Sequence, residues 1–179
     1  MGSYWRNAMN DREAMHMKLR PFQLGLFLGL CLCGVSAAQA PIQPVKWSSA
    51  LVPEASAKPG GKIAIGLSAE VQDGWHVYGL NQVSGGPIPL RLTLDDNAVA
   101  EGAGAPSGTP PVKRHDPSFN LDTELYLHSF SLCLPVQVKQ HAAAGDQSVP
   151  VSVRFQACSD RTCLPPRTVH LTVPIQVLP

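Results

Sequence analysis

The chain has 179 residues, which is enough for one domain with a hydrophobic core and too few for several large domains. Its formal net charge is +1, with no run of Lys or Arg to follow a phosphate backbone, so nucleic acid is not an expected partner. A hydrophobic fraction of 44% excludes a disordered chain and predicts a folded domain.

The N-terminus has the organisation of a secretory signal peptide. Lys18 and Arg20 precede an apolar stretch at 22–32, and small residues follow at 34–40. This stretch is shorter than the roughly 20 apolar residues that a membrane-spanning helix needs. We therefore expect a signal peptide at about 1–38 and a mature domain at 39–179 that enters an oxidising compartment without a membrane span of its own.

The mature part alternates apolar residues with polar or small ones, which is typical of strands with one buried face. In chain order we expect strands at 45–52, 63–71, 74–80, 90–94, 124–128, 130–138, 149–157 and 169–177, of which the first, third and fifth are weaker. No window has the spacing of an amphipathic helix, and turn residues separate the segments. The pattern predicts an all-β fold, an antiparallel β-sandwich of immunoglobulin-like type.

One stretch, residues 102–121, lacks this alternation. A loop of that length without secondary structure is usually functional or disordered. It contains Phe119, an aromatic residue among polar neighbours, which needs apolar contacts. From composition alone, Phe119 either fills the end of the sandwich or has a role in a site.

Cys158 and Cys163 are separated by four residues and lie between two predicted strands, near the tip of a hairpin. A bridge between them closes a loop of about six residues and is worth only roughly 2 kcal/mol in the chain-entropy model. That is weak for a structural staple, whereas thiol exchange needs an accessible pair. The residues themselves leave open a redox pair, a static disulfide and metal ligation.

The remaining cysteine and the histidines give no second site. Cys133 lies in a strand whose even-numbered positions are apolar, so its side chain should face away from them, as an inert thiol against a loop. The five histidines of the mature part have no spacing typical of a metal site, so we expect core or solvated residues and neither a metal nor another cofactor: His76, His115, His128, His141 and His170.

Three motifs resemble the periplasmic N-terminal domain of the thiol:disulfide interchange protein DsbD. The first is Cys-Ser-Asp-Arg-Thr-Cys-Leu-Pro-Pro at 158–166, entered through Phe-Gln-Ala. The others are Asp-Gly-Trp-His-Val-Tyr at 73–78 and His-Asp-Pro-Ser-Phe-Asn-Leu-Asp-Thr-Glu-Leu-Tyr at 115–126. Together they carry the resemblance across residues 42–178.

The resemblance implies an immunoglobulin-like fold with Cys158 and Cys163 as the exchanging pair on a hairpin at one end. It implies a cap loop whose Phe119 covers the disulfide, with Asp116 as the nearest carboxylate and Tyr78 packed nearby. We expect Cys158 to be presented to partners and Cys163 to be the second member. The implied location is the periplasm, the implied electron donor is a membrane-embedded protein, and the implied acceptors are thioredoxin-fold proteins that isomerise disulfides or serve cytochrome c maturation.

The sequence also departs from the family pattern. Four residues separate the cysteines where five are typical, and Pro117 and Ser118 replace acidic residues beside the cap phenylalanine. The chain stops at Pro179 with no membrane segments, so a separate protein is expected to donate electrons. The alternatives are a binding or structural sandwich of the cell envelope with a static disulfide, and copper binding by Cys158, Cys163 and a nearby histidine.

Overall fold

The computed structural model describes residues 42–50 and 55–179, and the predicted signal peptide lies outside these ranges. The regular structure of the described residues is entirely β-strand. The strands are β1 (Val45–Ala50), β2 (Ser56–Ala57), β3 (Lys62–Val71), β4 (Trp75–Tyr78), β5 (Arg91–Leu94), β6 (Ala100–Gly102), β7 (Ser107–Gly108), β8 (Val112–Asp116), β9 (Leu121–Tyr126), β10 (Phe130–Val138), β11 (Gly145–Phe155), β12 (Ala157–Ser159) and β13 (Arg167–Val177). None of the described residues forms a helix long and apolar enough to cross a membrane.

Two sheets form the sandwich. One has the order β1-β3-β10-β6, with β7 also paired to β10, and the other has the order β2-β13-β11-β5. All their pairings are antiparallel except that of β2 with β13. This arrangement confirms the predicted immunoglobulin-like β-sandwich.

The core lies between the two sheets and is built by the alternating residues of the long strands. Leu67 of β3 is paired with Leu132 of β10, and both are almost fully buried. Val151 and Val153 of β11 are fully buried on the facing sheet. Because successive side chains of a strand point to opposite faces, the period-2 pattern of the sequence places one face of each strand in the core.

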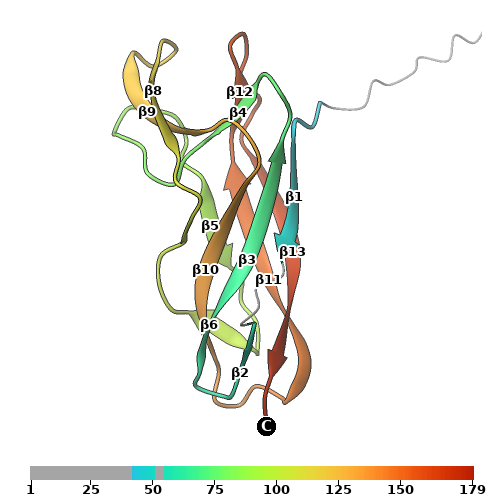
Figure 1. Ribbon diagram of the computed structural model, residues 1–179. Coiled ribbons are helices and arrows are strands. Elements are labelled where there is room, and N and C mark those ends of the chain that lie inside the picture. The colour runs from blue at the N-terminus through green and yellow to red at the C-terminus, as the bar shows by residue number, and fades with distance from the viewer. Residues whose placement is uncertain (1–41, 51–54) are drawn as a thin grey trace, which may run out of the picture. The chain divides into compact units, whose positions relative to one another are not determined.

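A third, smaller sheet of order β12-β4-β9-β8 lies at the end of the sandwich away from the C-terminus, as Figure 1 shows. It forms because the segment predicted as one strand at 149–157 is divided. β11 pairs with β13 and β5, whereas β12 pairs with β4, so that Ala157 lies opposite Val77 and Cys158 opposite His76. The cysteine segment therefore belongs to the third sheet.

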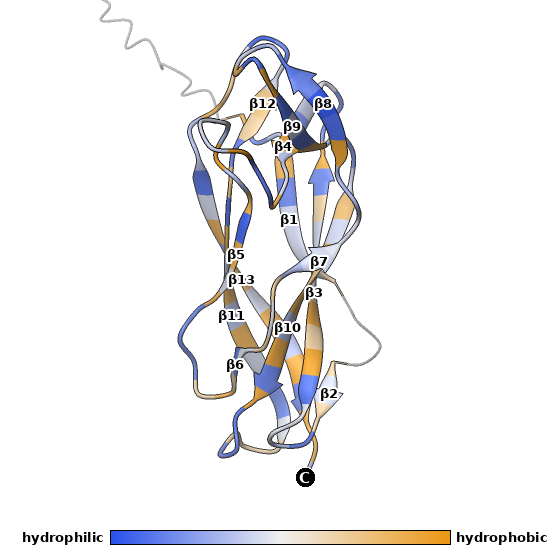
Figure 2. Cartoon of the chain, turned by 90° about the vertical axis from the view of Figure 1, so that its left-hand side faces the viewer, coloured by the Kyte–Doolittle hydropathy of each residue, from blue (hydrophilic) through white to orange (hydrophobic). Residues whose placement is uncertain are grey.

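The expected unstructured stretch at 102–121 is wrong in part, since it contains β7 and β8. Strand β8 pairs with β9 along its whole length, from Val112 opposite Leu125 to Asp116 opposite Leu121, and a turn at 117–120 joins them. The first four residues of β8 are exposed, and Figure 2 colours the strand mostly hydrophilic. Backbone pairing forms this strand without an apolar face, so the sequence carries no alternation that could have predicted it.

The orientation predicted for Cys133 is confirmed. Its neighbours in β10, Leu132 and Leu134, are buried in the core, whereas Cys133 is half-buried on the opposite face. There it is paired with Gly66 of β3 and Ser107 of β7. Its thiol is the free one among the described cysteines.

Candidate functional site

The two cysteines at the end of β12 form a disulfide. The sulfurs of Cys158 and Cys163 are 2.05 Å apart, and their Cα atoms are 4.0 Å apart. A tight turn joins them: the amide of Ser159 donates to the carbonyl of Thr162 at 2.8 Å, and the Ser159 hydroxyl accepts from the Thr162 amide at 3.2 Å. Pro165 and Pro166, which lack an amide hydrogen, follow without pairing to a strand, so the hairpin ends there.

The two cysteines differ sharply in exposure. Cys158 is 1% exposed, whereas Cys163 is exposed. Strand β12 is the edge strand of the third sheet, where Cys158 is paired with His76 of β4 on one side and bridged to Cys163 on the other. The more exposed member of the disulfide is therefore Cys163, not Cys158, which the sequence led us to expect as the one presented to partners.

The two faces of the third sheet have different surroundings. Val77, Ala157 and Tyr126 lie on the face that continues the main core. Tyr78, Leu125 and Cys158 form a separate buried cluster, against which Phe119 and Leu127 pack. The site is thus formed by the face of the third sheet that does not contribute to the sandwich core.

The turn at 117–120, which we call the cap turn, brings Phe119 to the cysteine cluster. Phe119 is half-buried, and its ring stands perpendicular to that of Tyr78 with the centroids 6.0 Å apart. Asn120, at the end of the turn, has a φ of 53°, a left-handed conformation that asparagine tolerates better than most residues. The local backbone thus reverses direction where the aromatic side chain packs against the cluster of Tyr78, Leu125 and Cys158.

A hydrogen bond joins the cap turn to the sheet beneath it. The Tyr78 hydroxyl donates to Oδ2 of Asp116 at 2.8 Å, and the Ser118 amide donates to Oδ1 of the same carboxyl group at 2.8 Å. Asp116 is only 7% exposed. Burial, followed by the hydrogen bond to Asp116, raises the pKa of Tyr78 well above its usual range, so the phenol remains a donor.

A cavity of about 220 Å³ adjoins this cluster. Its lining includes His76, Tyr78, Arg114, Asp116, Cys158 and Asp160. Three residues predicted for the site therefore line one cavity: Tyr78, Asp116 and Cys158. Phe119 packs against the cluster that contains Tyr78 and Cys158, and Cys163 is joined to Cys158 by the disulfide.

His76 is the member of the site that sequence reasoning missed. It lies two residues before Tyr78 in a strand, which places both side chains on one face, and their ring centroids are 5.2 Å apart. Burial lowers the pKa of His76, while the nearby carboxylates of Asp116 and Asp160 act in the opposite direction. The spacing from Tyr78 was visible in the sequence, but the position opposite Cys158 was not.

No metal centre competes with the disulfide in the part of the chain that the structure describes. Among these residues, no three or more His, Cys, Asp or Glu side chains are grouped so as to hold a metal ion.

The comparison with protein families agrees with this geometry. The family model described as thiol:disulfide interchange protein DsbD, N-terminal, matches residues 45–174. The chain belongs to the DsbD N-terminal domain family. The resemblance read from the sequence is thereby confirmed, and the family indicates a thiol–disulfide interchange module.

Solved structures similar to this DsbD N-terminal family member include one DsbD N-terminal domain. The reduced DsbD N-terminal domain of Neisseria meningitidis is 16% identical, with 67% of this chain and 80% of that chain covered and a TM-score of 0.45. The N-terminal periplasmic domain of ScsB from Proteus mirabilis is 13% identical, with 74% and 45% covered and a TM-score of 0.43. The fimbrial subunit AggA from Escherichia coli is 13% identical, with 75% and 94% covered and a TM-score of 0.37. No curated protein sequence matches the chain.

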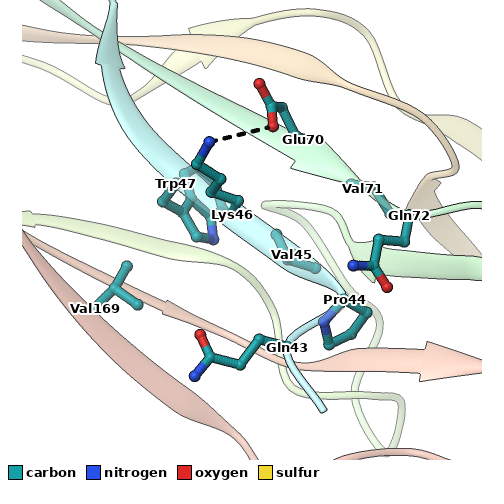
Figure 3. A pocket seen from close by; sticks show the side chains of 9 residues that line it. All are labelled: Gln43, Pro44, Val45, Lys46, Trp47, Glu70, Val71, Gln72 and Val169. Carbon is teal, nitrogen blue, oxygen red and sulfur yellow. Dashed lines mark ion pairs between the residues drawn. The ribbon is translucent and has the colours of Figure 1, made fainter.

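A second cavity of the DsbD N-terminal domain, of about 430 Å³, lies away from the cysteines and is shown in Figure 3. Residues of β1 and the end of β3 line it, together with Val169 of β13. Its charged residues, Lys46 and Glu70, form an exposed ion pair at 3.8 Å. The residues that line this cavity include no cysteine.

Proposed function

We propose that this protein is a periplasmic thiol–disulfide exchange domain that relays reducing equivalents through Cys158 and Cys163. The observation that carries the proposal is the asymmetry of the disulfide, whose Cys163 is exposed while Cys158 is buried in the cluster against which Phe119 packs. Exchange requires that a visiting thiolate reach one sulfur in line with the other. A bridge that served only as a staple would not need one exposed and one covered sulfur.

The relay consists of two balanced exchanges. A donor thiolate attacks Cys163, the Cys158–Cys163 bond breaks, and a mixed disulfide forms between the donor and Cys163 while Cys158 leaves as the thiolate. The donor's second thiolate then attacks the donor sulfur of the mixed disulfide, and Cys163 leaves as a thiolate, so the donor becomes a disulfide and the domain a dithiol. The domain next reduces an acceptor disulfide by the reverse sequence, in which Cys163 attacks and Cys158 resolves.

Three residues around the pair have roles that follow from their contacts. Phe119 covers Cys158 and limits its reaction with small oxidants until a partner displaces the cap turn. Tyr78 and Asp116 hold that turn against the sheet through their hydrogen bond of 2.8 Å. These assignments agree with the chemistry of the family and with the packing of the cluster.

The proposed setting follows from the signal peptide predicted at 1–38 and from the family. After its removal, the mature domain at 39–179 works in the periplasm. Its donor is a membrane-embedded thiol–disulfide protein, and its acceptors are thioredoxin-fold proteins, including those that serve cytochrome c maturation. The likeness in family to DsbD supports this class of partners.

The decisive experiment is a redox titration of the pair against a glutathione or dithiothreitol couple, followed by alkylation and mass spectrometry. An exchanging pair is expected to have a potential above about −300 mV, in the range of cellular thiol couples. A potential well below that value identifies a structural bridge and favours a binding or structural role in the cell envelope.

A trapping experiment tests the order of the two cysteines. With Cys133→Ala as the common background, Cys158→Ala leaves Cys163 without a resolving thiol and should accumulate mixed disulfides with thioredoxin-fold proteins. Cys163→Ala is the matched control and should accumulate far fewer, because Cys158 is covered. Trapping chiefly through Cys158 would restore the order expected from the sequence, and trapping through neither would contradict the relay.

A further inference from the structure

His76 lies directly opposite Cys158. The two residues are paired in the antiparallel register of β4 and β12. Side chains of such a pair project from the same face of the sheet, with Cβ atoms typically about 4.5–5.5 Å apart. Both also line the cavity of about 220 Å³ beside the disulfide.

The imidazole of His76 has an unused nitrogen at this place. Nε2 is buried and has no hydrogen-bond partner among the described residues. A buried polar atom without a partner is costly, and such atoms recur at sites that change state. In the disulfide form the sulfur of Cys158 has no hydrogen to donate, whereas in the dithiol form it carries one.

The other titratable groups around His76 are engaged or directed elsewhere. Tyr78, the next residue on the same face, donates its hydroxyl hydrogen to Asp116 of β8, whose second carboxyl oxygen accepts from Ser118. His115 of β8 is paired with Asp122 at 3.4 Å. Two exposed charges complete the surroundings, Arg114 of β8 and Asp160 of the cysteine turn.

We propose that His76 is the proton acceptor and donor for Cys158 during exchange. When Cys158 resolves a mixed disulfide, its S–H proton passes to Nε2 of neutral His76, its sulfur bonds to Cys163, and the partner leaves as a thiolate. In the opposite direction, imidazolium His76 returns a proton to the Cys158 thiolate released from the broken disulfide. This inference rests on the proposed function and adds a residue to it.

The burial of Cys158 explains why this cysteine needs a proton acceptor such as His76. A thiol in apolar surroundings ionises less readily than a free one, yet the thiolate is the nucleophile. Cys163 is exposed and ionises into water, so it has no need of a neighbouring base. The burial that lowers the pKa of His76 keeps the imidazole neutral near pH 7, which is the form that accepts a proton.

The test resolves the reactions of Cys163 and Cys158 as two successive kinetic phases. The reduced protein, with Cys133→Ala as background, is mixed with 5,5′-dithiobis(2-nitrobenzoate), and release of the coloured thiolate is followed by stopped flow. Attack by Cys163 gives the first equivalent, and attack by Cys158 on the mixed disulfide gives the second. In His76→Gln we expect the second phase to slow about 100-fold at pH 6.5, the typical loss of a general base, and the first to remain unchanged.

The pH dependence distinguishes proton transfer from a structural role. The defect of His76→Gln should shrink as the pH rises past the pKa of the Cys158 thiol, because ionisation then needs no base. His141→Gln, an exposed site in the connection between β10 and β11, is the matched control and should resemble the parent. The inference is overturned if the second phase of His76→Gln is unchanged, if it is slowed equally at every pH, or if both phases are slowed equally. None of these outcomes contradicts the relay. Absence of both phases in the parent contradicts the relay itself.

A measurement without substitution at His76 provides a second test. Nuclear magnetic resonance titration of the imidazole in the disulfide and dithiol forms should give a lower pKa in the dithiol form, because the protonated Cys158 thiol can donate a hydrogen bond to Nε2 of the neutral imidazole and the disulfide cannot. Identical titrations of His76 in the two forms would also overturn the inference.

Discussion

Replacing Tyr78 by phenylalanine tests whether the hydrogen bond to Asp116 keeps the cap turn closed. The substitution keeps the ring that packs against Phe119 and removes only the hydroxyl that donates to Oδ2 of Asp116 at 2.8 Å. Asp116 is 7% exposed, so in the closed state little water is available to replace the lost donor. When the turn opens, water solvates the carboxyl group in both proteins.

The expected size of the effect follows from that difference between closed and open states. A hydrogen bond to a charged group contributes about 1.5–3 kcal/mol. Each 1.4 kcal/mol corresponds to a tenfold change in an equilibrium constant, so Tyr78→Phe should raise the open fraction roughly 10- to 150-fold. Since Cys158 is 1% exposed and reacts when the turn is open, its reaction rate should rise by the same factor.

The assay is alkylation of Cys158 by iodoacetamide in a Cys133→Ala, Cys163→Ser background, followed by mass spectrometry. Tyr126→Phe is the matched control, because Tyr126 is a buried tyrosine of the same sheet that stacks on Phe130 at 3.9 Å, away from the cap turn. Equal alkylation rates in Tyr78→Phe and Tyr126→Phe would refute the reasoning. If the bond is the cause, Tyr78→Phe should also have little further effect in an Asp116→Ala background, which has no side-chain acceptor.

Three further predictions concern the same end of the sandwich. Phe119→Ala should speed alkylation of Cys158 in the same background, and an unchanged rate would contradict the covering role. Because Phe119 is half-buried, the loss of unfolding free energy, measured by urea unfolding, should be below the 3–5 kcal/mol typical of a fully buried phenylalanine. Burial lowers the pKa of His76 below 6.5 in the folded protein, so at pH values just below 6.5 the unfolded chain binds more protons and the unfolding free energy falls as the pH falls. This fall in unfolding free energy should be shallower in His76→Gln, and parallel curves for the two proteins would contradict the prediction. Gly79→Ala should cost about 1–3 kcal/mol, since a Cβ would lie 2.9 Å from that of Glu124, whereas Gly102→Ala, with nothing within 4 Å, should cost less in urea unfolding.

The strands of the sandwich were largely predictable from the sequence. The segments at 63–71 and 130–138 coincide closely with β3 (Lys62–Val71) and β10 (Phe130–Val138). Each of these strands buries one face along most of its length, so apolar residues recur at every second position of its sequence. The cysteine pair and Phe119 were predictable as well, because their motifs are local in the chain and match the family.

The candidate site was predictable only in its members and not in its arrangement. Nothing local distinguishes Cys158 from Cys163 in exposure, since the difference comes from pairing β12 with β4, some 80 residues away in the chain. His76 acquires its position opposite Cys158 from the same pairing. Strand β8 left no pattern because its side chains are largely exposed and its order comes from the β9 backbone.

The amino-acid sequence by itself determined the all-β class, the positions of the long strands and the identity of the two sulfurs, because hydrophobic alternation and short motifs are properties of neighbouring residues. The tertiary structure decided which sulfur is covered, which histidine faces it and how Asp116 holds the cap turn. These depend on strand register between distant segments, which is set by the faces that the whole fold buries and by the turns, and not by the residues next to each site.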